Sequence, residues 1–131
     1  MKLIAVLLCL PCTAFAQETI DCDLNGPQIE LNQCAYEDYQ AADAELNDVY
    51  KKAVAALKEM DSYQEPKDQI GVKTLKEAQR AWITYRDLAC EAEAFTFFGG
   101  TAAPMVHSGC MAAITRARTE DLRRIADIGD L

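Results

Sequence analysis

Apolar residues recur every three or four positions between residues 31 and 60, and this periodicity constrains the fold more than any other feature of the sequence. At 100° per residue these side chains fall within about 100° of one another, as in an amphipathic α-helix. They are Leu31, Ala35, Tyr39, Ala42, Leu46, Val49, Tyr50, Ala53, Leu57 and Met60. A long helix lying on a core is therefore expected over residues 31–60.

Two further helices are expected after a turn at Pro66. The second is clearest over residues 75–93, where one stripe holds Leu75, Ala78, Gln79, Trp82, Arg86, Ala89, Cys90 and Glu93. The third is expected from Ser108, as an N-cap, to about Asp127, with its exit at Gly129. A short connection makes the first two helices antiparallel. The predicted fold class is all-α: a small helical bundle built on a long antiparallel hairpin plus a third helix.

The first 16 residues have the features of a secretory signal peptide. Lys2 precedes a short apolar run at 3–10, and the segment ends in an Ala-x-Ala cleavage site at Ala16. Cleavage after Ala16 would leave residues 17–131 as one domain, periplasmic or secreted. No membrane span is expected, because a spanning helix needs about 20 apolar residues and no run is that long.

Four cysteines follow the expected leader: Cys22, Cys34, Cys90 and Cys110. An even number in an oxidising compartment favours two disulfides that crosslink the bundle. Our preferred hypothesis joins Cys22 to Cys34 and Cys90 to Cys110, so that each bond closes a short loop. Crossed pairing stays open, because an antiparallel hairpin can bring all four cysteines to the same end.

The domain is strongly acidic. Removing residues 1–16 takes one of the 13 Lys and Arg and none of the 21 Asp and Glu, which leaves a net charge of −9. Such a chain repels nucleic acid and anionic lipid, and long-range attraction speeds its encounter with basic partners. The alternative is that acidity serves solubility alone.

Polar side chains interrupt the apolar stripe of the second helix. Gln79 and Arg86 lie on this stripe with Trp82 between them, and a buried guanidinium needs an acidic partner. Candidate partners are Asp38, Asp43 and Glu93. We interpret Arg86 as half of an internal ion pair that fixes helix register, with ligand binding as the alternative. Arg118, also on an apolar stripe, has the same interpretation.

The segment 96–107 is expected to be a loop rich in aromatic residues and glycine. The favoured interpretation of Phe95, Phe97 and Phe98 is that they cover the core beside the cysteines. Alternatively, one or two face outward and contact a partner, as aromatic side chains of rigid loops do. The candidate partner-binding residues are Phe97, Phe98, Gly99, Gly100, Thr101 and Met105.

The sequence contains no recognisable catalytic centre. The only histidine, His107, has no nucleophile or metal-ligand spacing beside it, and Glu91 and Glu93 are typical of a solvated helix end. No enzyme activity, metal ion or cofactor is therefore expected.

Motifs spread over nearly the whole mature chain resemble the LprI-type family of bacterial envelope proteins. They are Leu-Asn-Gln-Cys-Ala at 31–35, Ala-Asp-Ala-Glu-Leu-Asn at 42–47 with Tyr50, Gln-Arg-Ala-Trp-Ile-Thr-Tyr-Arg-Asp at 79–87 with Cys90, Gly-Gly-Thr at 99–101 with Pro104, Met105 and Cys110, and the segment 115–122. The resemblance implies a secreted or periplasmic helical domain. The family is named after a mycobacterial lipoprotein that inhibits lysozyme, although here Pro11 stands where lipoprotein signals have a small residue before the cysteine.

Three functions follow as hypotheses. The first is a lysozyme inhibitor, in which the acidic, crosslinked scaffold presents its loop to the basic cleft of a muramidase. The second is an envelope interaction or stress protein that binds another partner, such as another basic envelope protein. The third and weakest is an enzyme, because no catalytic constellation supports it.

Overall fold

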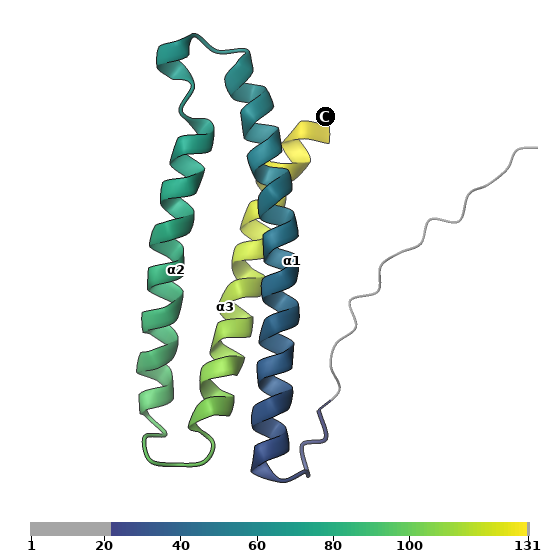
Figure 1. The fold of residues 1–131 in the computed structure, drawn as a ribbon, viewed down its shortest axis with the longest axis vertical. Coiled ribbons are helices and arrows are strands. Elements are labelled where there is room, and N and C mark those ends of the chain that lie inside the picture. The colour runs from purple at the N-terminus through teal and green to yellow at the C-terminus, as the bar shows by residue number, and fades with distance from the viewer. Residues whose placement is uncertain (1–21, 131) are drawn as a thin grey trace, which may run out of the picture.

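The computed structural model describes residues 22–130, so the predicted signal peptide lies outside the described residues. Within that range the chain is helical and contains no strand (Figure 1). The elements are α1 (Gln28–Ser62), the 3-10 helix η1 (Pro66–Asp68), α2 (Gly71–Phe95), α3 (Ala103–Ala126) and the 3-10 helix η2 (Asp127–Asp130). α2 runs antiparallel to α1, and α3 runs back in the direction of α1 (Figure 1). The predicted fold class is confirmed.

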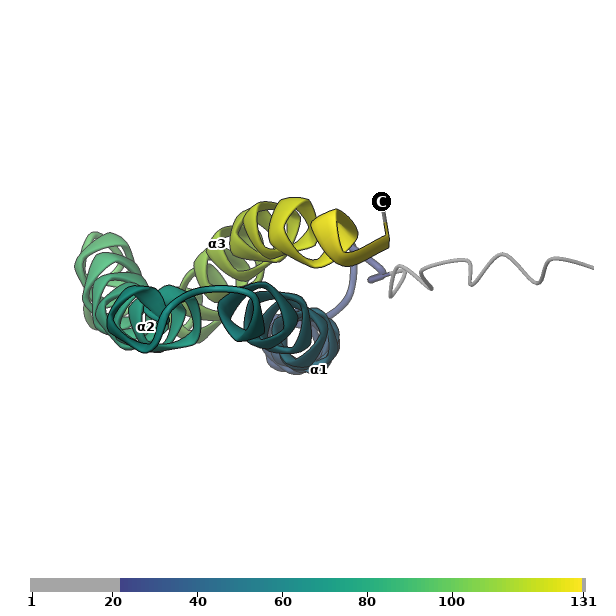
Figure 2. The same cartoon turned by 90° about the horizontal axis from the view of Figure 1, so that it is seen from above.

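The packing of α3 is mainly against α1, and α2 closes the other side of α3 (Figure 2). Small side chains face each other at the α1–α3 contact, which lets the two backbones approach closely: Ala42, Ala53, Ala56, Ala112, Thr115 and Thr119 are all buried. Larger apolar side chains fill the remaining space, with Leu122 fully buried among Leu46, Val49 and Leu75. Within residues 22–130, no helix is long and apolar enough to cross a membrane.

A second, smaller core lies where α2 ends and α3 begins. Cys90 and Cys110 form a disulfide there, with a Cα–Cα distance of 5.5 Å, and pack against Met111 and Tyr39. The other disulfide joins Cys22 to Cys34 in α1, with a Cα–Cα distance of 5.9 Å. The structure thus has the preferred pairing and not the crossed one.

The start of α2 depends on a contact from the end of α1. The Asp61 carboxylate accepts hydrogen bonds from the backbone N–H groups of Gly71 and Val72, at 2.9 and 3.0 Å. These are donors that a helix N-terminus leaves without intrahelical partners. A Cβ on residue 71 would lie 2.9 Å from Asp61 Oδ1, so glycine permits the approach. α2 therefore begins at Gly71, four residues before the range 75–93 in which the sequence pattern is clearest; the sequence left this earlier start open because glycine is a poor helix former.

The predicted start of α3 at Ser108 is wrong. α3 begins at Ala103, and Ser108 is buried inside the helix instead of capping it. Pro104 lies in the first turn, where its missing N–H costs no hydrogen bond and its fixed φ suits the helix. The segment 103–107, expected as loop, is thus helical, and the connection between the helices shortens to residues 96–102.

Candidate partner-binding site

The loop at 96–102 is built from consecutive tight turns. The N–H of Phe98 donates to the carbonyl of Phe95 at 3.0 Å, and the N–H of Gly100 donates to the carbonyl of Phe97 at 2.9 Å. Between them Gly99 has a φ of 79°, a left-handed conformation that side-chain-bearing residues adopt only with strain. The two glycines therefore give the loop a defined shape that exposes the residues before them.

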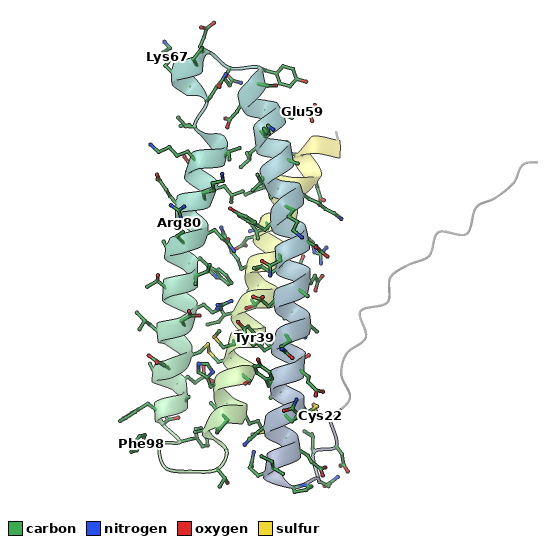
Figure 3. All side chains as sticks on the ribbon, in the orientation of Figure 1. Cys22, Tyr39, Glu59, Lys67, Arg80 and Phe98 are labelled. Atoms are coloured by element: carbon green, nitrogen blue, oxygen red, sulfur yellow. A yellow bond between two sulfur atoms is a disulfide. The ribbon has the colours of Figure 1, made fainter. Side chains whose placement is uncertain are left out.

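All three phenylalanines near the loop are exposed, so the favoured interpretation that they cover the core is wrong. Phe95, Phe97 and Phe98 are 70%, 48% and 82% exposed, and the rings of Phe95 and Phe98 lie 5.4 Å apart between centroids. Because α2 extends to Phe95, this residue lies about 140° around the helix from the buried Cys90. Figure 3 shows Phe98 at the end of the bundle, where α2 meets the loop.

α2 carries a second apolar stripe, which is exposed and was not predicted from the sequence. Its members alternate spacings of three and four residues: Ala78, Ala81, Tyr85, Leu88, Ala92 and Phe95. Tyr85 and Leu88 are both exposed despite their size. We call Phe95, Phe97 and Phe98, which lie at the end of this stripe, the aromatic patch. The spacing is visible in the sequence. The stripe was not predicted because the adjoining stripe with Trp82 and Cys90 already supplies the one buried face that the helix needs.

The remaining predicted site residues divide between two places. Thr101 is exposed on the loop, and its carbonyl accepts a hydrogen bond of 3.1 Å from the Asn32 amide, which ties the loop to α1. Met105 lies on α3, partly buried, with its sulfur 3.6 Å from the Gln28 amide nitrogen. It lines a separate hollow with Leu24 and others. The loop thus groups the predicted residues 97–101, and Met105 lies apart.

The end of the bundle that carries the loop is acidic. Residues 22–50 contain seven Asp and Glu and no Lys or Arg. Residues 87–107 contain three Asp and Glu and likewise no Lys or Arg. The first half of α1 and the second half of α2 both lie toward this end of the bundle (Figure 1). Within residues 22–130, no three His, Cys, Asp or Glu side chains are grouped so as to hold a metal ion. The charge of this end suits a basic protein surface.

The guanidinium of Arg86 is buried between two aromatic rings. It lies 5.0 Å from the centroid of Trp82 and 5.6 Å from that of Tyr39, and the residue is 7% exposed. Its nitrogens contact Asp87 at 2.9 Å and Asp43 at 3.5 Å. Burial raises the pKa of Tyr39 above its ordinary value of 10.0, and the positive charge of Arg86 opposes this rise.

Of the three carboxylates predicted to face Arg86, only Asp43 does so. Asp38 pairs with Arg116 on α3 instead, and Glu93 is exposed. The second partner, Asp87, is the immediate neighbour in sequence and was not predicted, because adjacent helical residues point in different directions. Arg118 Nε donates a 3.1 Å hydrogen bond to the buried Gln79, which links α3 to α2. That Gln79, Trp82, Arg86 and Arg118 fix helix register remains a prediction.

The pair of Asp38 and Arg116 joins α1 to α3. Arg116 donates to both Asp38 oxygens, at 2.9 and 2.6 Å. These hydrogen bonds lower the pKa of Asp38 below its ordinary value of 3.8, partly offset by burial, and raise the pKa of Arg116. A carboxyl group whose pKa is lower in the folded than in the unfolded protein stabilises the fold at any pH above its unfolded-state pKa. This contribution is lost as the pH falls through the folded-state pKa.

Asp38→Asn is therefore expected to lower the free energy of unfolding at pH 7 by roughly 0.5 to 1 kcal/mol, a small value because water screens the pair. The gap between wild type and variant should narrow as the pH falls below about 4, the unfolded-state pKa, and through the lowered pKa of Asp38 in the folded protein. Urea melts at pH 7, 4 and 2.5 measure this gap. A gap that stayed constant down to pH 2.5 would show that the ion pair does not stabilise the fold.

These features define a class: a small, disulfide-crosslinked three-helix protein with exposed aromatic side chains at an acidic end. The family model described as "Lysozyme inhibitor LprI" matches residues 22–122, and the chain belongs to this family. The resemblance seen in the motifs is thereby confirmed. The two disulfides also agree with an oxidising compartment.

Two curated proteins are similar to the chain. The uncharacterized protein R02472 of Rhizobium meliloti (strain 1021) is 43% identical over 128 residues, which cover 95% of this chain and 92% of that protein. The uncharacterized protein YecT of Escherichia coli (strain K12) is 27% identical over 106 residues, which cover 68% of this chain and 65% of that protein. No solved structure matches the chain significantly.

Proposed function

We propose that the protein is a lysozyme inhibitor that is exported, cleaved after Ala16 and active in the periplasm or outside the cell. The observation that carries the proposal is the aromatic patch, which lies exposed at the acidic end of a crosslinked bundle. Membership of a family described as lysozyme inhibitors directs the choice of partner. A muramidase of the chicken or goose type is the basic protein we expect to bind.

The loop suits this role because it is held in shape before binding. The disulfide between Cys90 and Cys110 joins the two helices that flank it, and Asn32 holds the carbonyl of Thr101. A rigid loop loses little conformational entropy on binding, so more of the contact energy appears as affinity. Exposed phenylalanines on such a loop are candidate hot spots, where one side chain contributes about 2 kcal/mol or more.

The acidic end is expected to affect the rate of association rather than the rate of dissociation. Its carboxylates accelerate encounter with a basic partner, whereas the phenylalanines set how slowly the complex dissociates. Salt shortens the Debye length from about 10 Å at 0.1 M to about 3 Å at 1 M. Association is therefore expected to slow with added salt much more than dissociation accelerates.

Clearing of a bacterial cell-wall suspension by lysozyme, followed by turbidity, tests the proposal. The mature protein at micromolar concentration and low salt is expected to slow clearing. Phe97→Ala/Phe98→Ala is expected to weaken inhibition by about 30-fold, which corresponds to about 2 kcal/mol. The matched control is Tyr63→Ala/Ile70→Ala, because both side chains are exposed but lie where α1 ends and α2 begins, at the opposite end of α2 from the loop.

The two double variants separate the loop from general surface hydrophobicity. The control should inhibit as wild type does, and both variants should melt as wild type does, since they remove exposed side chains only. Equal loss of inhibition in both variants would contradict the loop as the contact. No inhibition of either lysozyme type by the wild-type protein would contradict the function itself and favour an envelope protein with another partner.

A further inference from the structure

A groove between α1 and α2 lies apart from the loop and has a different character. Its volume is about 530 Å³, within the range of small-molecule sites. Leu46 and Tyr50 of α1 form one wall, and Trp82 and Ile83 of α2 form the other. Ile83 and part of Trp82 remain open to solvent. The groove therefore offers an apolar surface of the size of one aromatic or acyl group.

The charged side chains of the groove are mostly cationic, although the protein is acidic. Lys76, Arg80 and Arg86 line it against a single carboxylate, Asp43, which already contacts Arg86. Lys76 and Arg80 are exposed and make no ion pair with any side chain of residues 22–128. A cleft with one sign of charge concentrates ions of the opposite sign. Its charge is thus opposite to that of the loop end.

We propose that this groove binds a small amphipathic anion, in which a carboxylate, sulfonate or phosphate is joined to an aromatic or acyl body. The anionic group would pair with Arg80, whose fork of donors matches such oxygens, and with the ammonium of Lys76. The apolar body would lie against Trp82 and Ile83. Figure 3 shows Arg80 on α2, away from Phe98 and the loop, so this ligand would not compete for the aromatic patch.

Trp82 is the only tryptophan, so its fluorescence reports on the groove directly. Quenching at low salt by iodide, an anion, is compared with quenching by caesium, a cation, with neutral acrylamide as the reference for accessibility. With each quenching constant divided by its value for free tryptophan amide, a cationic groove predicts that iodide quenches about twofold better than caesium despite the net negative charge of the protein. Lys76→Gln/Arg80→Gln should abolish this preference. Equal or better quenching by caesium in the wild type would overturn the proposal.

Binding is measured with anilinonaphthalene sulfonate, an amphipathic aromatic anion, by energy transfer from Trp82. Lys76→Gln/Arg80→Gln is expected to raise its Kd about fivefold or more. Lys52→Gln/Lys67→Gln removes the same charge from the far side of α1 and from η1, and should leave the Kd unchanged. A Kd that rises equally in both variants, or in neither, contradicts binding in the groove.

Phe97→Ala/Phe98→Ala completes this experiment. It should leave the Kd for the dye unchanged, because the patch lies at the end of the bundle. If energy transfer from Trp82 were lost in this variant, the dye would bind at the aromatic patch, which would contradict binding in the groove. The outcome does not depend on lysozyme inhibition, because the groove variants retain the loop.

Discussion

Arg86→Ala is expected to lower the free energy of unfolding by about 2 to 3 kcal/mol. The guanidinium fills the space between Trp82 and Tyr39 and interacts with the faces of both rings, so its removal leaves a cavity and ends two cation–π contacts. Urea denaturation followed by circular dichroism measures the loss. An unchanged midpoint would show that Arg86 does not hold the helices together and would favour a ligand-binding role.

The cause of this loss differs from the one expected at the sequence level. A buried ion pair predicts a stranded carboxylate after Arg86 is removed, but the side chains of Asp43 and Asp87 are 39% and 52% exposed. Water can therefore solvate both carboxylates in the variant. Arg86→Met, which keeps the apolar stem, should cost about 1 to 2 kcal/mol, less than alanine. If methionine cost as much as alanine or more, the electrostatic contacts would outweigh packing.

Removing the disulfide between Cys90 and Cys110 is expected to cost about 3 kcal/mol. The bond closes a loop of 20 residues, for which the entropy lost by the unfolded chain predicts about 3 kcal/mol. Cys90 and Cys110 are also buried in the smaller core. The double alanine variant should show a reduced denaturation midpoint. It should also inhibit lysozyme less, because the loop then loses the bond that joins its flanking helices.

The disulfide between Cys22 and Cys34 is the natural control. It attaches the segment before α1, which packs little against the rest of the bundle, so its opening is local. We expect its removal to change the global free energy of unfolding by less than about 1 kcal/mol. If both double variants lost equal stability, the smaller core would not depend on its disulfide in the way proposed here.

Much of the fold was predictable because local patterns and global packing agree. The apolar period over residues 31–60 fixes α1 within a few residues, and the cysteine spacings favoured the observed pairing. The position of Arg86 on an apolar stripe predicted its burial, since a charged residue there must be enclosed by its neighbours.

The parts that the sequence did not predict depend on tertiary contacts. The start of α2 stayed open in the sequence because Asp61, ten residues before Gly71, caps the helix, and no local propensity reveals that hydrogen bond. The exposure of Phe95 and Phe98 depends on how far α2 extends before the turn at Gly99. Hydrophobicity alone places phenylalanines in a core, whereas a functional surface departs from that rule.

Titration calorimetry between the mature protein and a chicken-type or goose-type lysozyme at low salt tests the central claim most directly. The account predicts a saturable one-to-one complex with at least one type, with a Kd about 30-fold weaker for Phe97→Ala/Phe98→Ala and unchanged for Tyr63→Ala/Ile70→Ala. Absence of binding to both lysozymes at micromolar protein, or equal Kd values for the three forms, would contradict it.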